Sequence, residues 1–120
     1  MTRGKTAIGL AVVFLALAPA AATAQERLVG CSVDSDGKRM FDGRCRFIPD
    51  QGGSFALAHA DPNRPLYGRI LSISVFIVSP GVAEVRGLTD AGNNSRWGEA
   101  RRSRQDAACW VGSDFTVCAR

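Results

Sequence analysis

Ile70-Leu71-Ser72-Ile73-Ser74-Val75-Phe76-Ile77-Val78 is the stretch of sequence that decides the fold class. Its odd-numbered positions are all apolar and alternate at first with serines, which is the period of two expected of a β-strand. Phe76 and Val78 make the second face apolar as well, which predicts a strand that is central in its sheet. Ser79-Pro80-Gly81 supplies turn residues, so Val82 to Leu88 is expected to return as an antiparallel partner.

Outward from this hairpin, short apolar runs are separated by clusters of turn residues at intervals of about 8–12 residues. This spacing predicts an all-β fold, a small antiparallel sandwich or barrel of about six to eight short strands. Residues 99–108 leave room for at most one short helix. The expected strands are Leu28 to Val33, Arg44 to Ile48, Ser54 to Ala58, Arg69 to Val78, Val82 to Leu88, Trp97 to Arg101, Ala107 to Val111, and Phe115 to Ala119.

The four cysteines predict two disulfides that staple this domain. Cys109 and Cys118 flank a short hairpin whose turn is Ser113-Asp114, and that register places the two cysteines opposite each other, with Cα atoms about 4.5 Å apart. Cys31 and Cys45 bracket Asp-Gly turn signals and are expected to close a second hairpin. The spacings fit neither a zinc site nor a redox Cys-x-x-Cys motif, so no metal or cofactor is expected.

Residues 1–24 carry the features of a cleaved secretory signal peptide. Arg3 and Lys5 precede the apolar stretch 7–18, and Ala22-Thr23-Ala24 offers the small residues that place a cut before Gln25. As a helix the apolar stretch would rise about 18 Å, short of a hydrocarbon core of about 30 Å. We therefore expect residues 25–120 to form a single disulfide-bonded β domain, periplasmic or secreted by a bacterium, with no membrane span after cleavage.

Lipid anchoring through Cys31 is a minor alternative. Leu28-Val29-Gly30-Cys31 resembles the lipobox of bacterial lipoproteins. However, Glu26 and Arg27 separate it from the apolar stretch, and lipidation would leave an odd number of cysteines in an oxidising compartment.

The charge balance excludes a polyanion-binding tail. The chain has 15 Lys and Arg against 11 Asp and Glu, a net charge of +4. Loss of Arg3 and Lys5 with the signal lowers this to about +2, so nucleic acid is not an expected partner. Four of the basic residues that remain gather within nine positions, in a segment that holds the candidate ligand-binding residues Arg96, Trp97, Arg101, Arg102 and Arg104.

This segment could bind an anionic glycan or an acidic protein surface, because guanidinium groups recognise carboxylates and phosphates. The alternative is a solvated, salt-bridged strand end. Strand alternation would send Arg102 and Arg104 to one face and Arg101 to the other, so a continuous patch is not required by the sequence.

Catalytic residues are not expected. A small hydrolase would need the only histidine, His59, with Asp61 as its orienting group and Ser54 as nucleophile, but Ser54 lacks the context of a nucleophile elbow. Asp34-x-Asp36-Gly37 with Asp42 is an incomplete calcium loop and fits a hairpin turn better. Trp97 and Trp110 could present faces to sugars, but core positions are the simpler interpretation, above all for Trp110 beside Cys109.

Several short blocks resemble a pattern in small exported proteins of alphaproteobacteria: Cys31 with Asp42-Gly43-x-Cys45, Gly53-Ser54-Phe55, Ala108-Cys109-Trp110, and Val117-Cys118-Ala119-Arg120. The resemblance implies an exported, disulfide-stapled domain and transfers no catalytic residue. In size, export and β content the chain is also similar to periplasmic inhibitors of c-type lysozyme. Their inhibitory motif is missing from it, and a protein of about +2 gains little steering toward a basic enzyme.

The sequence thus favours a periplasmic or secreted binding or envelope-associated domain without catalytic activity. Its expected contact surface comprises the segment 96–104 and two long loops, residues 61–65 and 90–95. The alternatives are an inhibitor of a secreted enzyme such as a lysozyme and, less favoured, a small hydrolase.

Overall fold

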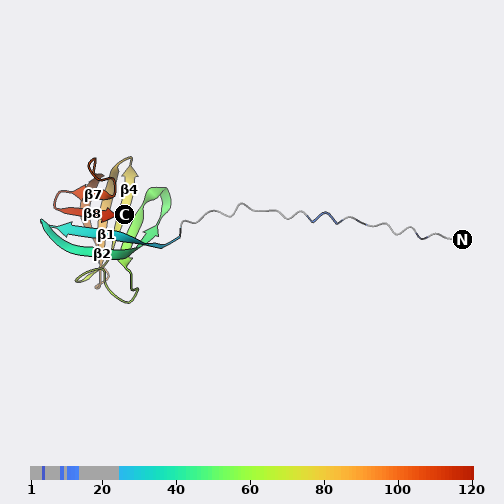
Figure 1. Ribbon diagram of the computed structural model, residues 1–120, viewed down its shortest axis with the longest axis horizontal. Helices are drawn as coiled ribbons and strands as arrows, with labels where there is room; N and C mark the ends of the chain where they lie inside the picture. The colour runs from blue at the N-terminus through green and yellow to red at the C-terminus, as the bar shows by residue number, and fades with distance from the viewer. Residues whose placement is uncertain (1–3, 5–8, 10, 14–24) are drawn as a thin grey trace.

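The chain folds into a closed antiparallel β-barrel, seen in a computed structural model that describes residues 4, 9, 11–13 and 25–120 (Figure 1). Each strand pairs with the next along the chain, and β8 pairs with β1 to close the barrel. Figure 1 shows β7, β8, β1 and β2 side by side in this order. The strands are β1 (Arg27–Ser35), β2 (Lys38–Pro49), β3 (Phe55–His59), β4 (Ile70–Ser79), β5 (Val82–Thr89), β6 (Asn94–Arg102), β7 (Cys109–Gly112) and β8 (Phe115–Ala119).

All of the strands expected from the sequence are present, and the all-β class is confirmed as a barrel. The predicted signal peptide, residues 1–24, lies outside the described residues except for the few positions given above. No helix among the described residues is long and apolar enough to cross a membrane.

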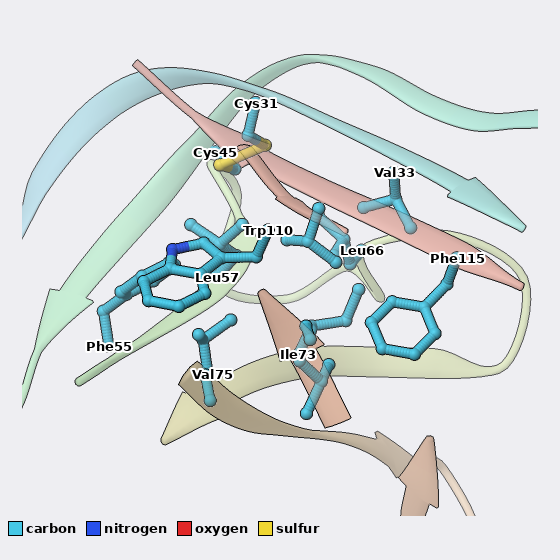
Figure 2. Packing of buried hydrophobic residues seen from close by; sticks show 14 of the residues in the cluster. Cys31, Val33, Cys45, Phe55, Leu57, Leu66, Ile73, Val75, Trp110 and Phe115 are labelled. Carbon is cyan, nitrogen blue, oxygen red and sulfur yellow. A yellow bond between two sulfur atoms is a disulfide. The ribbon is translucent and has the colours of Figure 1, made fainter. Parts of the chain in front are cut away.

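The interior of the barrel is filled by side chains. Trp110, Leu57 and Val75 point inward from different strands and are at most 2% exposed (Figure 2). A barrel of this strand number has an interior just wide enough for side chains or one small ligand. Because apolar side chains occupy that space here, a site for a polar ligand must lie on the outside.

The strand β4 is buried on one face only. Ile73 and Val75 are fully buried, whereas Phe76 and Val78 are 37% and 63% exposed. The expectation of apolar burial on both faces was therefore wrong at the end of this strand. In a closed barrel every strand has two neighbours, but its outer face meets solvent unless a loop covers it.

The hairpin of β1 and β2 is longer than the sequence predicted. Asp36 and Gly37 both have positive φ, 51° and 76°, which is the conformation of a two-residue type I′ turn. The second Asp-Gly pair, Asp42-Gly43, was read as part of a turn but lies within β2, opposite Ser32 and Cys31. Asp-Gly marks a turn only where the flanking strands can pair across it, and the first pair meets that condition.

Both expected disulfides are present. Cys109 lies directly opposite Cys118, with Cα atoms 4.0 Å apart, as the Ser113-Asp114 turn predicts. Cys31 and Cys45 are diagonal neighbours on β1 and β2, with Cα atoms 6.1 Å apart. Two disulfides indicate an oxidising, extracytoplasmic compartment.

No helix forms at residues 99–108. β6 continues to Arg102, and the next residues turn back toward β7. The Ser103 hydroxyl accepts the N–H groups of Gln105 and Asp106, each at 3.2 Å, and the Asp106 carboxylate accepts the N–H of Ala108 at 3.1 Å. Such side-chain bonds to nearby backbone compete with helical hydrogen bonds and explain the turn.

Candidate functional site

The predicted basic segment does not form one patch. β6 carries Arg96 and Trp97 near its first residues and Arg102 at its last. At about 3.3 Å per residue, Arg96 and Arg102 lie about 20 Å apart, at opposite ends of the barrel. The structure therefore divides the candidate ligand-binding residues into two groups.

The group at the end of β6 is dispersed. Arg101 is on the outer face and pairs with Glu99, with its Nη2 atom 3.1 Å from the carboxylate. Arg102 places its guanidinium over the buried Trp110 ring, 4.7 Å from the centroid. Arg104 is exposed in the turn between β6 and β7. The Arg102 guanidinium thus covers the buried Trp110 ring, and Glu99 partly neutralises the charge of Arg101.

The group at the start of β6 keeps an excess of positive charge. The Arg96 and Arg86 guanidinium groups both contact the Glu84 carboxylate, each at 2.9 Å. The hydrogen bond from Arg96, together with the charge of Arg86, holds the pKa of Glu84 below its usual value. One ionised carboxylate between two arginines gives these three side chains a net positive charge, and Asp114 lines the same hollow as Arg96.

Trp97 lies next to this excess charge and is half-buried. The pairing of β5 with β6 shifts register between Val85 and Arg86, because β6 has one extra residue there and bulges. Gly98, in this bulged segment, has a φ of 122°. The Trp97 indole covers Gly87 so closely that a Cβ there would lie 2.8 Å from Nε1. Its ring also meets the Phe115 ring edge-on at 5.6 Å. Trp97 is therefore held in one orientation, with part of its ring exposed.

Three adjoining hollows begin at this tryptophan and continue along the barrel, and we call them together the tip groove. The first, of about 270 Å³, is lined by Ser35, Arg96, Trp97, Asp114 and Phe115. The second, of about 570 Å³, shares Asp114 and Phe115 and lies between the β1–β2 and β7–β8 turns. The third, of about 370 Å³, shares Asp34, Arg39 and Thr116 with the second and follows the outer face of β1 and β8.

The two turns that border the tip groove are fixed to each other. The backbone N–H of Asp36 donates to the backbone oxygen of Asp114 at 2.8 Å. Arg39 donates to the carboxylates of Asp34 and Asp42, which holds all three side chains in the groove wall. A groove bordered by hydrogen-bonded hairpins is preorganised, which lowers the entropy lost on binding.

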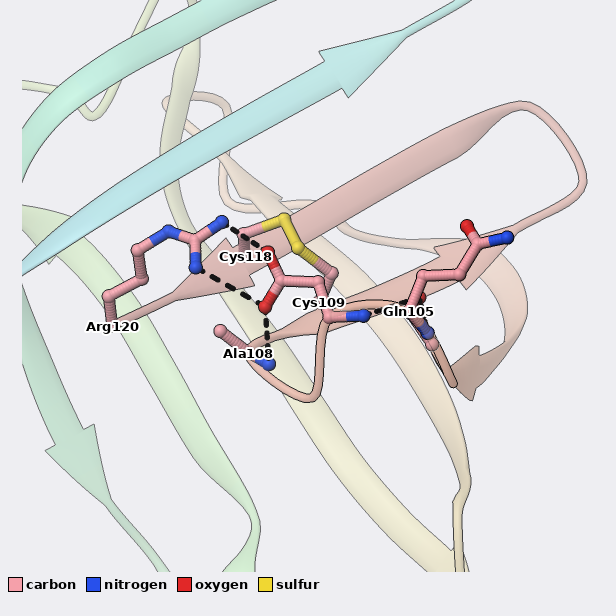
Figure 3. Close-up of polar contacts among 7 residues, drawn as sticks. Gln105, Ala108, Cys109, Cys118 and Arg120 are labelled. Carbon is pink, nitrogen blue, oxygen red and sulfur yellow. Dashed lines mark hydrogen bonds and ion pairs between the residues drawn. A yellow bond between two sulfur atoms is a disulfide. The ribbon is translucent and has the colours of Figure 1, made fainter.

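The far end of the tip groove is formed by the chain terminus. Arg120 donates to the Asp106 carboxylate beside the Cys109–Cys118 disulfide (Figure 3). This contact, followed by the N–H of Ala108, lowers the pKa of Asp106 below its usual value. Acidic and basic side chains therefore alternate along the tip groove, with small residues between them. Such a surface suits a polar, extended ligand.

The hydrolase residues do not converge. Ser54 directly precedes β3 and His59 is the last residue of β3, so at about 3.3 Å per residue the two lie about 16 Å apart. The Ser54 hydroxyl accepts the N–H of Ile77 at 2.9 Å. His59 Nδ1 accepts the backbone N–H of Asp61 at 2.9 Å, while the Asp61 carboxylate accepts the N–H of Asn63. This carboxylate does not orient the imidazole.

The aspartates of the incomplete calcium loop are accounted for by the Asp36-Gly37 turn and by the contacts of Arg39. Among the described residues, no group of three or more His, Cys, Asp or Glu side chains is arranged to hold a metal ion.

Comparison of the chain with protein-family models, curated proteins and solved structures finds no match. The site must therefore be inferred from its geometry. Sequence reasoning found Arg96 and Trp97 but missed Arg39, Asp114 and Thr116, which the tip groove adds. These residues come from separate hairpins, and only the pairing of β8 with β1 brings them together. The sequence shows the Asp-Gly and Ser-Asp turns as turn signals, but it does not show that the two turns lie next to each other.

Proposed function

We propose that this protein is a non-enzymatic binding domain of the periplasm or the secreted fraction, and that its tip groove binds an anionic glycan. The observation that carries the proposal is the partly exposed Trp97 beside Arg96, which shares the Glu84 carboxylate with Arg86, in a continuous groove outside a filled barrel. An indole face offers an apolar surface to the C–H groups of a sugar ring. A guanidinium offers a planar pair of donors to a carboxylate.

The remaining groups of the tip groove complement the polar groups of a saccharide chain. Asp114 can accept hydrogen bonds from sugar hydroxyls, and Ser35 and Thr116 can both donate and accept them. A location without a lipid anchor is favoured, because Cys31 is used in a disulfide and the residues that precede it belong to β1.

Replacing Arg96 with glutamine is expected to weaken binding of an oligogalacturonate about tenfold, since a charge-assisted hydrogen bond contributes about 1.5–3 kcal/mol and tenfold is about 1.4 kcal/mol. Isothermal titration at low salt measures this. Arg101→Gln is the matched control, because it removes an arginine of the same strand that also pairs with one carboxylate.

The Arg101→Gln variant should bind within about twofold of the unchanged protein. A neutral galacto-oligosaccharide should bind much more weakly than the acidic one. Equal losses in both arginine variants, or equal binding of the acidic and the neutral sugar, would contradict an anionic glycan site at Arg96.

A second candidate, inhibition of a secreted enzyme such as a lysozyme, is supported by the two turns. They hold the exposed Asp36 and Asp114 next to each other, and an acidic pair on linked hairpins complements a basic enzyme cleft. An excess of the protein is then expected to slow cell-wall lysis by a c-type lysozyme, and the Asp36→Asn/Asp114→Asn variant to restore it. An unchanged rate of lysis would eliminate this candidate.

A further inference from the structure

Part of β2 has a neighbour on one side only. β2 pairs with β1 from Lys38 onward, but it pairs with β3 only from Cys45 to Pro49. β3 ends at His59, where the chain leaves the barrel wall in a loop. We call residues 38–44 of β2 the open edge.

The backbone of the open edge presents hydrogen-bonding groups to solvent. Gly30 on β1 accepts the N–H of Arg120 at 2.8 Å, so its backbone groups face β8 and not β2. Its partner across the ladder is Arg44, whose N–H and C=O therefore point away from β1. Alternation along the strand gives Asp42 the same orientation.

None of the backbone hydrogen bonds outside the strand ladders, among the residues that the structure describes, reaches the open edge. Unpaired N–H and C=O groups on an edge are a template for an added strand.

The side chains of the open edge favour an acidic strand. The open edge carries one acidic residue, Asp42, and three basic residues, Lys38, Arg39 and Arg44. Arg39 is paired with aspartates, whereas no ion pair among the described residues includes Lys38 or Arg44. Arg44 shares the outer face of β2 with Asp42, so an incoming strand with a carboxylate on its outer face would neutralise Arg44. Lys38 lies beyond the register shift between Phe41 and Arg39 and adds positive charge at that end of the edge.

The inner face of the open edge is apolar. Phe41 is half-buried against the core, and its ring lies 6.4 Å from the His59 ring, edge to face. An added strand in line with β3 would place every second side chain toward these rings. Alternating acidic and apolar residues therefore match the two faces.

A second copy of this chain fits the open edge poorly. Antiparallel self-pairing around Phe41 would bring the basic residues at the two ends of the open edge, Lys38 and Arg44, near those of the other copy, and the register shift between Phe41 and Arg39 would interrupt the ladder. Like charges directly opposite each other destabilise a sheet. The same basic residues that attract an acidic strand thus oppose self-association.

We propose that the open edge of β2 binds an extended acidic segment of a partner protein as an added β-strand. This surface goes beyond the glycan site of the tip groove. It shares Arg39 and Asp42 with that groove, whereas Lys38, Phe41 and Arg44 do not line it.

The test uses a capped eight-residue peptide in which glutamate alternates with valine, and a control peptide in which lysine replaces glutamate. We expect the acidic peptide alone to bind. Its binding should slow hydrogen exchange of the Asp42 and Arg44 amides, which no ladder bond protects in the free protein. Because this readout uses the unmodified protein, it does not depend on any variant folding.

Two variants at one position separate charge from backbone. Arg44→Gln removes the charge and keeps the N–H, and should weaken peptide binding about threefold. Arg44→Pro also removes the outward N–H, at an edge position where proline is tolerated, and should weaken binding by at least about tenfold. Both variants should bind the oligogalacturonate normally, so failure here is distinguishable from failure of the glycan site.

Peptide binding without slower exchange at Asp42 and Arg44 would overturn the proposal, as would equal binding of the lysine peptide. A dimer that Arg44→Pro dissociates, in a protein that binds no peptide, would overturn it in favour of self-association. Arg44→Pro binding as tightly as Arg44→Gln would exclude backbone pairing at this edge.

Discussion

Replacement of Cys109 and Cys118 together by serine is expected to lower the free energy of unfolding by about 2–3 kcal/mol. The disulfide joins directly opposed residues of β7 and β8, and its loss frees the denatured chain from a closed loop. Both positions are also buried, at 8% and 6% exposure, so serine hydroxyls would need new hydrogen-bond partners there. The melting temperature should fall by roughly 10–20 °C, measured by circular dichroism.

The Cys31–Cys45 pair provides the matched comparison. Its sequence separation is 14 residues against 9 for Cys109–Cys118, and loop-closure entropy depends only on the logarithm of loop length. Serine at both of these positions should therefore cost nearly the same. An alanine pair at 109 and 118 isolates the hydroxyl contribution. A melting temperature equal to that of the unchanged protein, under oxidising conditions, would show that the disulfide framework is mistaken.

Features encoded by neighbouring residues could be predicted from the sequence. The alternation in β4 defined a strand, and Ser113-Asp114 fixed the register that sets Cys109 opposite Cys118. These predictions succeeded because strand period and turn length are local, and a two-residue turn leaves one register.

Features that depend on contacts between distant segments could not be predicted. Closure of the barrel pairs β1 with β8, and nothing local to either strand specifies it. Strand alternation already divides the arginine segment between two faces, but only the fold shows that β6 spreads it along the barrel and gives Arg96, Arg101 and Arg102 different surroundings. Composition located the charges, while the tertiary fold decided which of them stay uncompensated.

The open edge also depends on how distant segments meet, because it results from the different lengths of the neighbouring strands β2 and β3. β2 is longer than β3, because the type I′ turn at Asp36-Gly37 extends the first hairpin beyond the point where β3 ends at His59. A closed barrel removes edges only where neighbouring strands match in length. The extra length of β2 thus creates both the wall of the tip groove and the unpaired backbone beside it.

Truncation of Trp110 to alanine is expected to be the most destabilising single substitution, with a loss of about 3–5 kcal/mol in the free energy of unfolding. Trp110 is 2% exposed and is the largest of the fully buried side chains. Its removal would also leave the Arg102 guanidinium without the ring beneath it. Urea denaturation followed by circular dichroism measures the loss, and Val111→Ala, at the next residue but 43% exposed, should change stability by less than about 0.5 kcal/mol.

The same Trp110→Ala variant tests whether the interior serves as packing or as a ligand site. A cavity lined by apolar side chains stays dry and binds small apolar molecules such as benzene. Benzene should therefore raise the melting temperature of Trp110→Ala and leave that of the unchanged protein where it is, because its interior is already filled. Oligogalacturonate binding, measured below the melting temperature of the variant, should persist, since Trp110 does not line the tip groove. Loss of less than about 1 kcal/mol, or a benzene effect in the unchanged protein, would mean that the barrel holds internal space and that an interior ligand must be sought.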